Sequence, residues 1–175
     1  IDVASGRTAP IDLGPVDGPI AGLAVVADGT LVVKTPTEGW RQDHDTGRLV
    51  PLFAGTTPLE RLALAGDDRT ALVTIAHGAD GKIRMWRAGV GPTVIATVAG
   101  MPGKLAVSAD GRKVVVATSA ALHLLDVPTG VVRHLADLPA EVNRIAIDPT
   151  QRRAAIVTKG PDVFLIDLAT GALEV

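Results

Sequence analysis

The chain of 175 residues contains no cysteine and no tyrosine, and its only aromatic side chains are two Trp and two Phe. Without cysteine there are no disulfides, thiolate metal sites or cysteine nucleophiles. Glutamate occurs at only four positions, which leaves few groups for acid–base chemistry. The sequence also lacks a Gly-x-Ser-x-Gly elbow, a His-Glu-x-x-His motif, a phosphate loop and a dinucleotide fingerprint. We therefore expect no enzyme activity, no catalytic residues, no cofactor and no metal site.

Long hydrophobic runs and a large excess of one charge are also missing. Hydrophobic residues make up 47% of the chain, yet no apolar run approaches the ~18 residues of a membrane span. The formal net charge is −2, without the basic excess typical of nucleic-acid binders. No basic and apolar signal segment follows Ile1. We expect neither membrane insertion nor a nucleic-acid partner, and we attribute the apolar composition to sheets buried on both faces.

What the chain does contain is a short segment that recurs five times. The copies all end in glycine and mostly begin with aspartate: Asp2–Gly6, Asp43–Gly47, Arg87–Gly91, Asp126–Gly130 and Asp167–Gly171. Their final glycines are 41, 44, 39 and 41 residues apart. A period of roughly 40 residues is typical of blade-type propellers.

Within each period the strands and turns follow one order. The first strand has Leu or Ile followed by Ala, at 23–26, 62–64, 105–107 and 145–147. A polar turn comes next, and Asp-Gly between two apolar runs, as at Asp110-Gly111, is a strong hairpin signal. The second strand is rich in β-branched residues, at 31–33, 71–74, 114–118 and 155–158. No window shows a 3.6-residue period, so we predict essentially no helix.

Four short antiparallel strands per period predict an all-β fold of propeller blades, with about 4.3 repeats. A sandwich is the alternative, but its turns have no reason to recur in register. We expect one partial propeller domain over residues 1–175. Its blades lie approximately at 1–18 (the last two strands only), 19–57, 58–100, 101–140 and 141–175.

The segments 105–118 and 122–130 resemble a degenerate WD-repeat, or the related WD-like repeats of bacterial β-propellers. Asp80-Gly-Lys-Ile-Arg-Met-Trp86 keeps the spacing that the WD-repeat family has between its turn Asp and its third-strand Trp. Leu125-Asp126 and Ile166-Asp167 stand where that family has Trp-Asp, although no Gly-His dipeptide precedes a first strand. The resemblance implies a WD-like propeller architecture in which Trp86 is a core residue.

Closed propellers contain whole blades, so a fractional number leaves apolar blade faces open at both ends. Three arrangements would cover these faces. The chain is a piece of a larger or split propeller that other blades complete, or two copies pair as a homodimer. Alternatively, the N-terminal strand completes the last blade of a four-bladed ring. We favour the first arrangement because the sequence opens with a third strand.

Three cationic residues are the strongest candidates for a binding site. Arg61, Lys104 and Arg144 each stand immediately before the start of an innermost strand. Innermost strands line the channel of a propeller, so the three side chains would lie at its mouth. We predict that they bind an anionic ligand or an acidic partner loop. The alternative is that nearby Glu60 and Glu141 neutralise them.

Three further features have a structural and a functional interpretation. Trp40 lies near a turn and is a candidate interface anchor. The aspartates of the turns would gather on one face as an acidic surface, but we favour local capping of their own turns. His123 and His134 lie on successive strands and could face each other, and we interpret them as structural rather than as a ligand pair.

We therefore predict a non-catalytic protein-interaction or scaffold module. It would be a WD-like propeller region of a larger bacterial protein or half of a split propeller, with a protein or the remaining blades as its partner. Arg outnumbers Lys 12 to 5, which favours a bacterial source with a GC-rich genome. The alternative is an enzyme or small-ligand binder of the hydrolase or lactonase type, with a site in a central channel that other blades complete.

Overall fold

The computed structural model describes residues 13–14, 16–25, 30–43, 45–54, 61–67, 70–77, 81–87, 90–100, 103–119 and 121–175. All regular secondary structure in these ranges is β-strand, which confirms the predicted all-β class. Of residues 1–18, where the last two strands of a further blade are expected, the structure describes only 13–14 and 16–18, so this expectation stays a prediction.

The strands form four separate sheets, each of four consecutive antiparallel strands in chain order. The first two sheets consist of β1 (Gly22–Val25), β2 (Leu31–Lys34), β3 (Glu38–Gln42) and β4 (Leu49–Ala54), then β5 (Arg61–Asp67), β6 (Thr70–His77), β7 (Lys82–Arg87) and β8 (Val90–Thr97). The third and fourth consist of β9 (Leu105–Val107), β10 (Lys113–Ala117), β11 (Ala121–Asp126) and β12 (Val131–Asp137), then β13 (Val142–Ile147), β14 (Arg153–Thr158), β15 (Val163–Asp167) and β16 (Leu173–Glu174).

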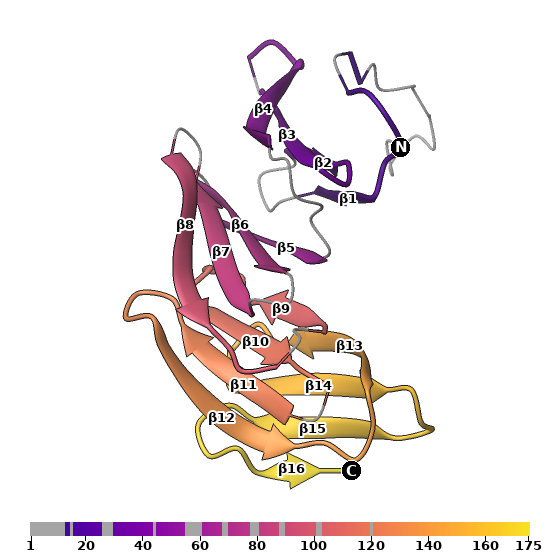
Figure 1. Ribbon diagram of the computed structural model, residues 1–175, viewed down its shortest axis with the longest axis vertical. Helices are drawn as coiled ribbons and strands as arrows, with labels where there is room; N and C mark the ends of the chain where they lie inside the picture. The colour runs from indigo at the N-terminus through magenta and orange to yellow at the C-terminus, as the bar shows by residue number, and fades with distance from the viewer. Residues whose placement is uncertain are drawn as a thin grey trace.

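The sheets follow one another along an arc, with β1–β4 at one end and β13–β16 at the other (Figure 1). The first strands lie on the inside, since β9 contacts both β5 and β13. The fourth strand of each sheet lies at its far edge. Four-stranded antiparallel sheets whose first strands meet around an axis are propeller blades. The chain is therefore an arc of propeller blades.

The core lies between the blades. On β10, Val114, Val115 and Val116 are all fully buried, although successive strand residues point to opposite faces. Val114 and Val116 pack with Ile83 of the second sheet, while Val115 packs with Ile156 of the fourth. Each buried branched side chain stabilises the fold by about 1.5–3 kcal/mol relative to exposure. Burial on both faces explains why the strands are apolar without alternation.

The recurring glycine-ended segment forms the turn between the third and fourth strands of the first, third and fourth sheets. In the second sheet β8 begins at Val90, so Gly91 lies within the strand, and the copy at Asp2–Gly6 lies outside the described residues. Gly47, Gly130 and Gly171 have φ angles of +68°, +70° and +78°. Each donates its N–H to the carbonyl of the aspartate four residues earlier, at 2.8 Å. A positive φ is readily adopted only by glycine, so the glycine of the repeat is a requirement of the turn.

Candidate binding site

The three predicted cations occupy equivalent places at the start of neighbouring inner strands. Arg61 is the first residue of β5, Lys104 directly precedes β9, and Arg144 lies near the start of β13. Because β9 contacts both β5 and β13, the backbone brings these three positions to one end of adjacent strands. We call this set of three residues the rim.

The rim cations that the structure describes in full have no local counter-ion. Lys104 is half-buried and Arg144 is exposed, and within the described ranges neither side chain makes a hydrogen bond or an ion pair. Glu141, offered by the sequence as a neutralising partner, forms an ion pair with Lys159, with Nζ and Oε2 2.7 Å apart. The side chain of Arg61 and all of Glu60 lie outside the described part of the chain.

Lys159 was not identified from the sequence. It follows β14 in the turn that leads to β15, and its N–H also donates to the carbonyl of Glu141 at 2.8 Å. The two residues are 18 positions apart and meet because β13 pairs with β14. The only local signal for Lys159 was its position directly after Thr158, the residue that ends the second strand of its sheet.

Trp40 lies on β3 and contributes to packing. Its half-buried ring is packed with Leu31, Val33 and Leu49 in a small apolar cluster. The ring nitrogen is buried and has no hydrogen-bond partner among the described residues. Trp40 is therefore held by the first sheet, and its role as an interface anchor stays a prediction.

The aspartates of the turns bind their own turns, as local capping predicts. Thr129 donates from its hydroxyl and its N–H to Oδ1 of Asp126, at 2.6 and 3.0 Å. These hydrogen bonds hold the pKa of the Asp126 carboxyl below its usual value, and the bond from the hydroxyl has the larger effect. Thr46 and Thr170 bind Asp43 and Asp167 in the same manner. An acidic docking face is not needed to explain these residues.

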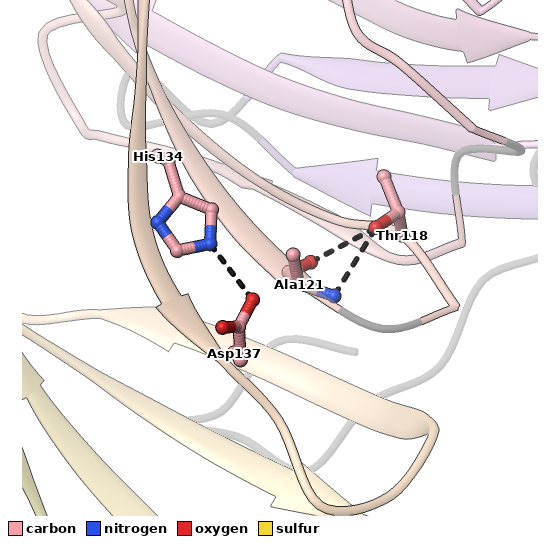
Figure 2. Close-up of polar contacts among 4 residues, drawn as sticks. All are labelled: Thr118, Ala121, His134 and Asp137. Atoms are coloured by element: carbon pink, nitrogen blue, oxygen red, sulfur yellow. Dashed lines mark hydrogen bonds and ion pairs between the residues drawn. The ribbon is translucent and has the colours of Figure 1, made fainter.

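The two histidines do face each other across β11 and β12. Their rings meet edge to face with centroids 5.6 Å apart. Burial of His123, and next the nearby His134, lower the pKa of His123, while Asp137 opposes them. His134 also hydrogen-bonds Oδ1 of Asp137 at 3.0 Å, as Figure 2 shows. No group of three or more His, Asp or Glu in the described ranges could hold a metal.

A third recurrent feature was not identified from the sequence. Thr35 and Thr118 directly follow the second strand of their sheets, Thr158 ends that of the fourth sheet, and all three are buried. The Thr118 hydroxyl donates to the carbonyl of Ala121 and accepts its N–H, at 3.3 and 3.2 Å (Figure 2). Recurrence of Thr at this place in three of four blades was the available signal.

Nowhere in the described residues is there a helix long and apolar enough to cross a membrane.

Comparison with known proteins supports the fold. No protein-family model and no curated protein matches the sequence. Among solved structures, the chain is similar to Hsv2 of Kluyveromyces lactis, a propeller protein, with a TM-score of 0.69 and 11% identity. The match covers 87% of this chain and 50% of Hsv2, so the chain spans about half the length of that neighbour. The fold and the candidate site together define the class of structure: an arc of propeller blades with a cationic rim.

Proposed function

We propose that this chain is a non-catalytic protein-interaction module with WD-like blades. It is a region of a larger bacterial propeller protein, or half of a split propeller, and its rim binds an acidic segment of a protein partner. The observation that carries the proposal is the rim itself: Arg61, Lys104 and Arg144 stand at equivalent places on adjacent inner strands.

Electrostatics supports an acidic partner segment. Lys104 and Arg144 have no counter-ion among the described residues, so their charges are available to a ligand. Cations gathered at one end of a channel attract anions over about a Debye length, ~8–10 Å at physiological salt. An extended chain with several carboxylates could contact all three positions at once.

Other parts of the chain support a binding role rather than catalysis. The turn carboxylates Asp43, Asp126 and Asp167 are engaged by the hydroxyl and N–H groups of their own turns. The fold is shared with a propeller protein of which the chain spans half the length. Propellers commonly present their loops and channel mouths to partners.

The test uses a fluorescein-labelled oligoglutamate peptide as the acidic probe, with anisotropy as the readout. The variant R61Q/K104Q/R144Q removes all three rim charges. Exposed charge pairs are worth about 0.2–1 kcal/mol each, so we expect roughly tenfold weaker binding. Binding to the wild-type chain should also weaken as salt rises.

The matched control removes three other exposed cations, at Arg48, Arg112 and Arg152 on the opposite face. This variant has the same net charge as the rim variant and should keep wild-type affinity. Equal losses in the two variants would mean that only net charge matters, and the rim proposal would be wrong. Hydrolysis of an ester or lactone substrate by the wild-type chain would instead favour the enzyme alternative.

A further inference from the structure

The inner strand of the fourth sheet extends further than that of the third at the end where the rim lies. β9 begins at Leu105, whereas β13 begins at Val142. Ile145 is the equivalent of Leu105, since each directly follows a rim residue. β13 therefore starts three residues earlier, and a register shift between Val142 and Arg144 marks a bulge in this extension. Bulges re-aim side chains and are over-represented next to active sites.

The extension brings Glu141 against Lys159. The N–H of Lys159 donates to the carbonyl of Glu141 at 2.8 Å, one step beyond the last paired residues of β13 and β14. Their side chains form the ion pair of 2.7 Å between Nζ and Oε2. Lys159 directly follows Thr158, and the residues that follow the equivalent threonines are Pro36 and Ser119. Neither of these is charged, so among these three sheets only the fourth can form this ion pair.

Lys159 lies beside the rim. Arg144 is paired with Val157, two residues before Lys159 in the chain. Diagonal neighbours of this kind on adjacent strands lie ~7–8 Å apart, within reach of long side chains. An arginine and a lysine at that spacing can contact neighbouring carboxylates of one ligand. The fourth sheet therefore carries two cations at this end, and one of them already holds a carboxylate.

The ion pair between Glu141 and Lys159 is open to exchange. The side chains of Lys159 and Glu141 are 64% and 58% exposed. Both residues lie beyond the ends of their strands, so their exposure belongs to the turns and not to an outer face of the sheet. Exposed ion pairs are weak, because water and salt screen both charges. A carboxylate of a ligand can therefore replace Glu141 on Lys159.

We propose that Glu141 is an intramolecular competitor for the acidic partner segment. It holds Lys159 while the site is free, and a carboxylate of the partner takes its place when the partner binds. The exchange replaces one ion pair by another, and the displaced Glu141 repels the partner, so Glu141 lowers the affinity of the site. This inference rests on the proposed function, since it concerns the regulation of the same site.

The variant Glu141→Gln tests the competition with the fluorescein-labelled oligoglutamate peptide, with anisotropy as the readout. This variant leaves Lys159 available, so the peptide should bind roughly two- to fivefold more tightly than to the wild-type chain, which is the contribution of one exposed ion pair. Asp162→Asn is the matched control and gives the same net charge. Asp162 is an exposed acid three residues after Lys159 in the same turn, so this control should stay near wild-type affinity.

A second pair of variants asks whether the effect passes through Lys159. Lys159→Gln should weaken binding, because the peptide can no longer contact this cation. In the Lys159→Gln background, Glu141→Gln should tighten binding no more than Asp162→Asn does, since no cation is left to release. The altered side chains are exposed, so circular dichroism should show the wild-type fold for every variant.

Two results would overturn this inference alone. An affinity of Glu141→Gln no higher than that of Asp162→Asn would mean that Glu141 acts only through the net charge. A gain from Glu141→Gln that persists undiminished in the Lys159→Gln background would mean that Glu141 repels the peptide directly and does not compete for Lys159. The variant R61Q/K104Q/R144Q keeps both residues. If it binds the peptide as tightly as the wild type, the proposed function itself is wrong and this inference falls with it.

Discussion

Gly171 lies against the backbone carbonyl of Leu135, so closely that a Cβ atom at position 171 would stand 2.5 Å from the Leu135 oxygen. Gly171 ends a turn of the fourth sheet, and Leu135 lies on β12, the outer strand of the third. Gly130 has the same relation to Ile95 of the second sheet, at 3.0 Å. The glycine of the repeat therefore shapes a turn and also lets neighbouring blades approach.

Alanine at the three repeat glycines should destabilise the fold in a graded order. Gly47→Ala adds a Cβ that meets nothing within 4 Å, so it should cost only the ~1–2 kcal/mol of a left-handed backbone. Gly171→Ala adds a clash with a backbone carbonyl, for a total of about 2–4 kcal/mol, and Gly130→Ala should fall between. Urea unfolding checks the order. Equal losses at all three positions would mean that the interblade contact adds nothing.

Gln151 has a φ of +58°, and no other non-glycine residue of the described chain has a positive φ. It takes the place that Gly111, with φ +69°, has in the third sheet. Gln151→Gly should therefore relieve up to ~1 kcal/mol of backbone strain, offset in part by the loss of the hydrogen bond from the Gln151 side chain to Asp110. The bond from Lys113 should persist because it reaches the backbone carbonyl of residue 151. Gly111→Gln is the reciprocal control and should destabilise by about 1–2 kcal/mol.

Replacing Thr118 by Val should remove both hydrogen bonds to Ala121 while keeping the shape of the side chain. The N–H of Ala121 would lose its acceptor, at a cost of about 1–3 kcal/mol. Thr118→Ser keeps the hydroxyl and should lose less. Thr158→Val should also be milder, because the Thr158 hydroxyl makes a single long bond, 3.4 Å, to the carbonyl of Asp162. Thermal unfolding of the three variants tests the ranking.

Acidification should destabilise the protein through His123. Burial and the neighbouring His134 lower the pKa of His123 in the fold, so the unfolded chain binds a proton first. Stability is therefore greatest above the ordinary pKa of about 6.5 and falls as the pH drops from there to the lower folded pKa. His123→Gln should flatten this part of the curve of melting temperature against pH. In His134→Gln, NMR titration should show the pKa of His123 moving up, since the repulsive neighbour is gone.

A second loss of stability should come at lower pH from the turn aspartates. Hydrogen bonds from Thr129 and Thr170 hold the pKa values of Asp126 and Asp167 below the ordinary value of 3.8. Their contribution is present above pH ~4 and is lost as the pH falls through the folded pKa. Asp126→Ala/Asp167→Ala should melt below the wild type at pH 7, and the difference should shrink toward pH 2. A difference in melting temperature that stays constant with pH would mean that these two aspartates do not contribute to the loss of stability in acid.

Features with a local cause were readable in the sequence. Asp126 and Gly130 predicted their turn because a short acceptor and a positive φ are both local requirements. The same holds for the valines of β10, whose branching favours a strand. The Thr118 bonds are equally local and were missed because Thr has several other uses in sheets.

Only part of the candidate site could be predicted from the sequence. The position of Lys104 before an inner strand followed from the repeat, because strand order is fixed by the period. The pairing of Glu141 with Lys159 did not follow, because it depends on the register between two strands. Burial of Trp40 likewise depends on which face of β3 meets the cluster around Leu31 and Val33.

The sequence by itself determined the period, the strand order and the turns, because each of these is set within a few residues of chain. Only the tertiary structure decided which blade faces are covered, that Glu141 pairs with Lys159, and how closely Gly171 approaches Leu135. These relations join residues about 18 to 40 positions apart, and sheet register and interblade packing fix them rather than any local preference of the backbone.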